Sequence, residues 1–267
     1  MEQSVLTEFV TLPSRGLIYP KEMNVPEGLS IKPFKVKDLK GLFGNNSKEA
    51  LDSLINNCIN QEFSFDVKDL HLEDKTALWI RIRAITLGNT FSVKKKCMSC
   101  GAVFDVSWNL DDIVVDYLDL DEYPIHVTLP ESGTEITMGV ILPSDIKMIK
   151  DFVSKKRSLI KTGSFDESSE LLFSVFAASI KSINNSMLSL ESKTEFLSSC
   201  TPDDFGYIKQ IIDALKFGII SEKEINCPSC GTAHNIQLNS DEEFFRRTHE
   251  LPKGIRVQKK TIKCNPS

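Results

Sequence analysis

The chain has 267 residues, and its composition of 41% hydrophobic and 26% charged residues is that of a globular protein, which excludes disorder throughout. Its formal net charge is -5, but seven of its 32 basic residues and only one of its 37 acidic residues lie in 246–263, which leaves 25 basic and 36 acidic residues elsewhere. This acidic excess argues against broad contact with nucleic acid or an anionic membrane. No stretch approaches the roughly 20 apolar residues that span a bilayer, so no membrane span is expected.

In chain order, residues 1–30 are expected to form an extended N-terminal arm, because Pro13, Pro20 and Pro26 fix φ and lack an N–H donor. Such an arm is expected to lie across a surface, either that of its own domain or that of a partner. Alternating apolar residues then predict a short strand at 31–36.

Two helices are expected next. Apolar residues at i, i+3, i+4 and i+7, from Leu51 to Cys58, predict a helix that starts after Ser47. A second helix is expected from about residue 72 to 87, because Gly88 can take the positive φ that stops a helix.

The rest of the chain alternates between hairpins and helices. Residues 89–96 and 102–110 are predicted to form a β-hairpin, since alternating apolar side chains from Phe104 onward are typical of a half-buried strand. Residues 123–140, which are interrupted at Pro130, predict a second hairpin. The remaining predicted elements are helices at about 146–153, 171–180 and 201–218 and a mobile loop at 157–168.

The sequence contains two Cys-x-x-Cys-Gly motifs, which we call knuckles, with their cysteines at Cys97 and Cys100 and at Cys227 and Cys230. Two such pairs have the spacing of a structural zinc site, so the four cysteines are predicted to bind one Zn²⁺. Fe(II) accepts the same ligands, and a redox Cys-x-x-Cys is the other alternative, although that motif normally occurs once, at a helix N-terminus. Four cysteines leave no open position for catalytic zinc, and the lone His234 is interpreted as a surface residue or a neighbour of the ligands.

The two knuckles lie 130 positions apart, and the same shift superposes Gly88 on Gly218 and Asp74 on Asp204. We interpret this agreement as an internal duplication. Each half is expected to contain a helix, a glycine stop, a strand, a knuckle and a second strand.

The predicted fold is therefore α+β, with two pseudo-repeated halves joined by one discontinuous four-cysteine zinc ribbon. Trp108 and Leu238, which correspond under the shift, are expected to form the apolar shell of the zinc site. The expected domains are the extended arm (1–30), the first repeat with the first knuckle (31–118), a β-hairpin bridge (119–142), the helical second repeat with the second knuckle (143–245) and a basic C-terminal tail (246–267).

No phosphate-binding loop, dinucleotide-binding motif, zinc-protease motif or nucleophile elbow occurs in the sequence, and its four histidines are scattered. No catalytic or cofactor-binding residue is therefore assigned, and no enzyme activity is expected. Acidic pairs such as Asp203-Asp204 are interpreted as helix caps or solvated groups. Cys58 and Cys200 are interpreted as small hydrophobic residues, and Cys264 as a free thiol in the tail.

Three features resemble one known family: the arm Leu12-Pro13-Ser14-Arg15-Gly16-Leu17-Ile18-Tyr19-Pro20, the helix with Trp79-Ile80-Arg81-Ile82-Arg83, and the two knuckles, of which the second precedes Phe244-Phe245. From about residue 10 to 246 the chain is similar to the baseplate hub proteins of T4-like contractile-tailed bacteriophages. The resemblance implies a non-enzymatic structural or assembly subunit of the baseplate hub, with other hub or tail proteins as partners. It implies synthesis in the host cytoplasm and a place in the virion tail baseplate, whereas the basic tail is an addition to the family's pattern.

A zinc-ribbon nucleic-acid-binding protein is the alternative function, suggested by the knuckles and by the basic residues from 246 to 263. The acidic excess of the remaining chain argues against a duplex-binding face. Few aromatic residues lie among the lysines of the tail, although stacking on bases requires them. The sequence does not set the oligomeric state.

Overall fold

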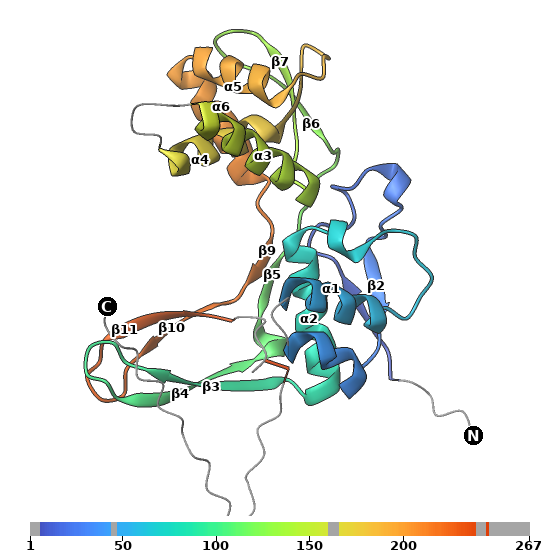
Figure 1. Cartoon of the computed structure of the whole chain (residues 1–267), viewed down its shortest axis with the longest axis vertical. Coiled ribbons are helices and arrows are strands. Elements are labelled where there is room, and N and C mark those ends of the chain that lie inside the picture. The colour runs from blue at the N-terminus through green and yellow to red at the C-terminus, as the bar shows by residue number, and fades with distance from the viewer. Residues whose placement is uncertain (1–5, 44–46, 160–165, 239–243, 246–267) are drawn as a thin grey trace, which may run out of the picture.

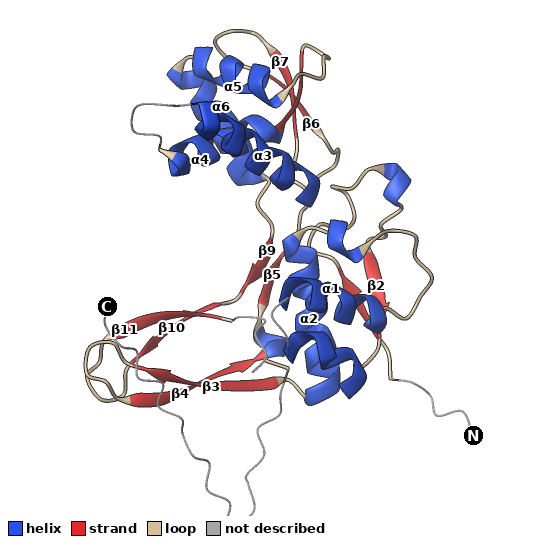
Figure 2. Ribbon diagram, viewed as in Figure 1, coloured by secondary structure: helices blue, strands red, loops and turns tan. Residues whose placement is uncertain are grey.

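The structure, a computed structural model, describes residues 6–43, 47–159, 166–238 and 244–245. Figure 1 shows two lobes and a long ribbon that projects from the first of them. Helices make up much of each lobe, whereas the ribbon and the link between the lobes consist of strands (Figure 2). Among the described residues, no helix combines the length and the apolar character that crossing a membrane requires.

The first lobe is built from a β-hairpin and two α-helices. Its elements are β1 (Glu8–Thr11), β2 (Gly28–Ile31), α1 (Ser47–Cys58) and α2 (Leu72–Leu87), with the 3-10 helices η1 (Lys21–Met23), η2 (Val36–Phe43) and η3 (Val67–Asp69) between them. β1 and β2 pair antiparallel. Leu12, Ile18 and Tyr19 of the proline-rich segment are buried. Of the two surfaces considered for the arm, its described part therefore lies on the chain's own lobe.

Both helices of this lobe agree with the periodicity of the sequence. α1 buries Leu54, Ile55 and Cys58, which were placed on one face. α2 ends at Leu87, and its cap, Gly88, has a φ of 92° that favours glycine.

The strand predicted at 31–36 is wrong. Only Ile31 belongs to β2, and the chain enters η2 at Val36. Pro33 explains the difference, because a proline has no N–H group with which to continue a strand ladder.

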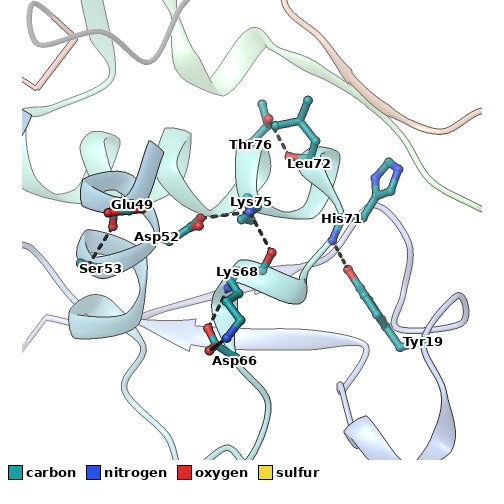
Figure 3. Close-up of polar contacts among 10 residues, drawn as sticks. All are labelled: Tyr19, Glu49, Asp52, Ser53, Asp66, Lys68, His71, Leu72, Lys75 and Thr76. Carbon is teal, nitrogen blue, oxygen red and sulfur yellow. Dashed lines mark hydrogen bonds and ion pairs between the residues drawn. The ribbon is translucent and has the colours of Figure 1, made fainter. Parts of the chain in front are cut away.

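A buried ion pair fixes α1 against α2. Figure 3 shows the Lys75 ammonium of α2, which lies 3.0 Å from the Asp52 carboxylate of α1 and 3.4 Å from the backbone oxygen of Lys68. The Lys75 and Asp52 side chains are 6% and 16% exposed. Removal of one partner from such a pair costs about 3–5 kcal/mol, because it leaves the other charge buried and unpaired.

The second lobe contains a three-stranded antiparallel sheet, in the order β6, β7, β8, and four helices among the described residues. Its elements are β6 (Ile125–Thr128), β7 (Glu135–Met138), α3 (Pro143–Leu159), α4 (Glu167–Ser179), β8 (Ile180–Ile183), α5 (Leu190–Ser199) and α6 (Pro202–Ala214). The hairpin predicted at 123–140 is confirmed by the pairing of β6 with β7.

The structure corrects two helix bounds in this lobe. The helix predicted to end at residue 180 ends at Ser179, and Ile180 is the first residue of β8, where it pairs with Met138 of β7. The last helix ends at Ala214, not at Gly218, which begins the next strand. The loop predicted at 157–168 is wrong at both ends, because α3 continues to Leu159 and α4 begins at Glu167; residues 160–165 of this loop lie outside the described residues.

Two short strands join the lobes. β5 (Val114–Asp116) and β9 (Gly218–Ile220) pair antiparallel, with Val115 opposite Ile219. The N–H of Ile219 also donates to the Glu73 carboxylate at 3.0 Å, which attaches β9 to the start of α2. The link therefore contacts the first lobe as well as connecting it to the second.

The ribbon consists of two antiparallel hairpins from distant parts of the chain, which lie side by side in Figure 1. The first hairpin contains β3 (Thr90–Lys96) and β4 (Val103–Asn109), and the second contains β10 (Glu222–Asn226) and β11 (Ala233–Gln237). A 3-10 helix, η4 (Leu110–Asp112), follows β4. The first hairpin was predicted, and its alternate residues Phe104, Val106 and Trp108 are buried. Each hairpin carries one knuckle at its turn.

Candidate metal centre

The tips of the two hairpins bring the four predicted cysteines together. The sulfur of Cys97 lies 3.7 Å from that of Cys230, and the sulfur of Cys100 lies 3.7 Å from that of Cys227. All four sulfurs lie within 4.8 Å of one another. A tetrahedral zinc with bonds of about 2.3 Å places its sulfurs about 3.8 Å apart, so the cluster has the size of one four-thiolate site.

Each knuckle turns in the same way. Gly101 N donates to Cys97 O at 3.0 Å, and Gly231 N donates to Cys227 O at 2.9 Å. The two glycines have φ values of 75° and 73°, which disfavour any residue with a Cβ. The knuckle sequence therefore produces one local conformation at two distant places in the chain.

The sulfur contacts are related by a local two-fold arrangement. The shift of 130 residues converts the contact between Cys97 and Cys230 into the contact between Cys227 and Cys100, and both measure 3.7 Å. Burial follows the same rule, because the first cysteine of each knuckle is buried and the second is exposed. The two hairpins therefore contribute equivalent halves of the cluster.

Polar groups beside the cluster act on its sulfurs. His234 Nε2 lies 3.2 Å from Cys97 Sγ, where the Nε2–H tautomer donates to sulfur, and the Thr232 hydroxyl lies 3.2 Å from Cys230 Sγ. The His234 ring packs at 5.8 Å from the Phe104 ring. Of the two interpretations of His234, the geometry agrees with a neighbour of the ligands.

The thiols differ in acidity. The backbone N–H of Cys100 is the largest influence on Cys97 and, with the N–H of Ser99 and with His234, lowers its pKa to about 5. At Cys100 the N–H of Ala102 lowers the pKa, but hydrogen bonds with the other thiols, that of Cys230 foremost, outweigh it and raise the pKa to about 12. Four thiolates so close together repel one another, so the four thiols do not all lose their protons readily. A cation at the centre of the cluster removes this repulsion and favours the thiolate form of all four.

Trp108 and Leu238 do not lie beside the cluster, and this prediction is wrong. Trp108 pairs with Phe91, whereas Lys96 and Val103 form the pair next to the knuckle. Five residues of strand separate the two pairs, which corresponds to about 17 Å. Leu238 likewise follows β11, at the end away from its knuckle. Phe104 and His234 occupy the position that was expected for these residues.

In the described part of the chain, no other group of three or more His, Cys, Asp or Glu side chains lies close enough to share an ion. The site has four sulfur donors and no open position. Such a donor set suits a thiolate-preferring metal in a structural role, and it offers no place for a substrate.

Two buried aspartates were not recognised from the sequence as anchors of turns. Asp74 accepts hydrogen bonds from Ser14 N at 2.9 Å, from the Ser14 hydroxyl at 2.6 Å and from the Tyr19 hydroxyl at 2.5 Å. Asp204 accepts from Glu131 N at 2.9 Å and from Ser132 N at 3.1 Å. We call these two arrangements aspartate latches, because each ties the turn of a hairpin to the first turn of a helix.

A repeated motif underlies the two latches. The turns have the sequences Leu12-Pro13-Ser14-Arg15-Gly16 and Leu129-Pro130-Glu131-Ser132-Gly133. The first begins the long connection between β1 and β2, the second lies between β6 and β7, and their glycines have φ values of 74° and 67°. These turns are offset by 117 residues, not 130, so a single shift along the sequence does not show the correspondence.

Comparison with family models gives a match over residues 16–246 with a family described as T4 bacteriophage base plate protein. The matched region includes both knuckles, Gly16 at the end of the first turn motif and all of the second turn motif. Comparisons with curated proteins and with solved structures gave no match. Because the matched region covers most of its length, the chain belongs to the T4 bacteriophage base plate protein family.

Proposed function

We propose that this protein is a non-enzymatic structural or assembly subunit of the phage baseplate hub, and that a structural Zn²⁺ bound by Cys97, Cys100, Cys227 and Cys230 stabilises it. The observation that carries the proposal is the meeting of two knuckles, which lie 130 residues apart in the sequence, in one cluster of four sulfurs. Family membership supports the baseplate part of the proposal. Other hub or tail proteins are the proposed partners, and the proposed location is the virion tail after synthesis in the host cytoplasm.

The proposed metal has a clear mechanical role. A structural zinc with thiolate ligands contributes on the order of 10 kcal/mol, which is comparable to the whole stability of a typical domain. Because the ligands lie 130 residues apart, the ion closes a loop that contains the entire second lobe. The bound ion would keep the tips of the two ribbon hairpins together while the lobes bind neighbouring proteins.

We also propose that the chain arose by duplication of one unit. Each unit contains a hairpin with a Leu-Pro-x-x-Gly turn, helices, an aspartate latch and a knuckle hairpin, in this order. The equivalence of the two sulfur contacts supports this proposal. The unit boundaries then differ from the earlier division, since residues 119–142 correspond to the N-terminal hairpin and not to a separate bridge.

Substitution of a ligand tests the metal site. Cys227→Ser is expected to abolish the retention of about one zinc per chain and to lower the melting temperature by about 10 °C or more, because several kcal/mol of metal binding are lost. Elemental analysis and thermal unfolding measure both effects. Cys200→Ser is the matched control, because Cys200 lies outside the cluster and is partly exposed. Full zinc content and unchanged melting in Cys227→Ser would contradict the proposal.

Association with the hub tests the assembly role separately. The wild-type protein is expected to co-purify with other hub components from infected cells, and its deletion is expected to leave tails incomplete. A protein that binds no hub component and whose deletion leaves tails intact is not a hub subunit, whatever its metal content.

A further inference from the structure

A groove of about 280 Å³ lies between β1 and the segment that contains β5. Its floor is formed by Ala77 and Ile80 of α2, and its walls include Val10 of β1 and Val115 of β5. Among the described residues, β1 pairs only with β2, and β5 pairs only with β9. Each strand therefore has a second edge with unpaired backbone groups, which an extended segment can complete.

The two ends of the groove are closed. At one end Leu118 N donates to Pro13 O at 2.8 Å, just beyond both strands. At the other end Arg81 binds Glu8 at 2.6 Å and Asp111 at 2.7 Å. These contacts fix the walls of the groove, so only the few residues of an occupant that lie between β1 and β5 can pair with them, and the rest of the occupant extends over the surface beyond.

The surface around the groove is acidic. The acidic segment, residues 111–122, has no basic residue and has six exposed carboxylates, at Asp111, Asp112, Asp116, Asp119, Asp121 and Glu122. The nearby bases are already engaged, because Arg81 binds two carboxylates and Arg15 binds Asp119 at 3.2 Å. An occupant is therefore expected to combine apolar side chains with positive charge.

One segment of this chain has that chemistry. Residues 254–263, which lie outside the described residues, contain four basic residues, no acid and no proline, and their apolar Ile255 and Val257 alternate with polar residues. We propose that the groove between β1 and β5 binds residues 254–263 of the same chain as an added strand, held by backbone pairing and by the acidic segment.

The chain is long enough for this contact. Phe244 O accepts a hydrogen bond from Arg83 at 3.3 Å, and Arg83 also donates to Thr90 O at 2.9 Å. Asn89, next to Thr90, donates to Asp111 at the end of the groove. The eight residues 246–253 span up to about 26 Å, which exceeds the width of about 12 Å of a helix such as α2.

Tethering makes even a weak contact effective. A linked segment has an effective concentration on the order of 1 mM, so a dissociation constant of about 0.1 mM keeps it bound about nine-tenths of the time. Trypsin is then expected to cleave after Lys259 and Lys260 about tenfold more slowly than in a free segment, since cleavage follows the open population.

Zero-length cross-linking of the full-length protein with a carbodiimide tests the contact. The expected products join Lys259 or Lys260 to carboxylates of residues 111–122 or to Glu8. They should form within one chain at any protein concentration, and they should disappear in 1 M salt, which screens exposed charges. Cross-links only between chains, or only to other surfaces, would overturn the proposal.

Variants separate the groove from its surroundings. Val115→Lys places a charge in the groove and is expected to raise tryptic cleavage at Lys259 about tenfold. Val114→Lys is the control, because Val114 is 59% exposed and lies on the same strand outside the groove lining. Zinc content reports whether each variant keeps its ribbon.

A change in the segment itself leaves the groove intact. Lys259→Glu with Lys260→Glu is expected to raise cleavage after Arg256 about tenfold relative to the wild type. Equal cleavage rates in this variant and in the wild type would overturn the proposal even if Val115→Lys failed to fold. Neither result depends on the zinc site or on the hub.

Discussion

Single carboxylates organise both lobes of this protein. Asp74 and Asp204 are fully buried in the first turn of a helix, where negative charge is favoured, and each accepts hydrogen bonds from a Leu-Pro-x-x-Gly turn. In the first lobe Ser14 and Tyr19 of the distinctive arm both donate to Asp74. The most recognisable motif of the sequence therefore has a structural role, which is to supply hydrogen-bond donors to a buried carboxyl group.

The two latches are expected to respond to pH with opposite sign. Burial tends to raise the pKa of Asp204, but the N–H groups of Glu131 and Ser132 outweigh it and lower the pKa below the ordinary value of 3.8. Ionised Asp204 therefore stabilises the fold above this pH, and the stabilisation is lost as the pH falls through the lowered pKa. Asp204→Asn is expected to reduce the loss of unfolding free energy below about pH 4.

Denaturant unfolding at a series of pH values measures this effect. Asp203→Asn is the matched control, since Asp203 is the exposed neighbour on the same turn. At Asp74 burial is the largest influence and raises the pKa despite the donors, so its ionisation opposes folding as the pH rises. The unfolding free energy of Asp74→Asn, relative to that of the wild type, should therefore increase as the pH rises. If Asp74→Asn and Asp204→Asn showed the same trend with pH, the opposite signs assigned to the two latches would be wrong.

Residue identity allowed the cysteine cluster to be predicted but not the latches. Cys97 and Cys227 belong to a spacing that has few structural uses other than metal binding. An aspartate in a first helical turn, such as Asp204, normally caps its own helix in contact with water, and the sequence does not reveal that a remote turn covers it. Only the three-dimensional position of the Leu-Pro-x-x-Gly turns identifies their acceptor.

At the scale of elements, each hairpin of the ribbon has two different ends. The tip carries the knuckle, and the base of the first hairpin contributes Phe91 and Trp108, whose rings lie 5.9 Å apart. Phe91 also lies 4.9 Å from Phe244, which packs edge-on against Trp79 of α2 at 4.6 Å. The base is therefore attached to the first lobe by aromatic packing, whereas only the tip depends on the proposed metal.

His234→Ala and Trp108→Leu are expected to separate these two ends. Loss of the contact from His234 to Cys97 should weaken metal affinity about tenfold or more, as is usual for groups that orient ligands. Trp108→Leu should lower the melting temperature but leave metal affinity unchanged, because about 17 Å of strand separates it from the knuckle. Competition with a chromophoric chelator measures affinity. An equal loss of affinity in both variants would show that the hairpin responds as one unit.

Periodicity predicted the long elements well and the short ones poorly. The helix 72–87 has enough turns for its buried face to be recognised, and Gly88 marks its end. β5 and β9 have three residues each, which is too few to show alternation, and their pairing depends on contacts between remote segments. Trp108 was misplaced for a related reason, since sequence shows that a residue is buried but not at which end of a hairpin it lies.

At the scale of the whole molecule, the second lobe lies between two connections to the first. β5 leads into it and β9 leads out of it, and these two strands pair with each other. The proposed metal closes the same loop a second time at the tip of the ribbon. Because β5 and β9 pair without the metal ligands, removal of the ion is expected to open the ribbon but not to separate the lobes.

Hydrogen exchange after treatment with a strong chelator tests this expectation. The amides of Gly101 and Gly231, which close the two knuckles, should exchange about 100-fold faster or more, because several kcal/mol of metal binding are lost. The amide of Ser132, held by Asp204, and that of Ile219, held by Glu73, should keep their protection because neither touches the cluster. Simultaneous loss of protection at all four amides would mean that ribbon and lobes unfold together. Unchanged exchange at the two glycines would mean that no metal stabilises the knuckles.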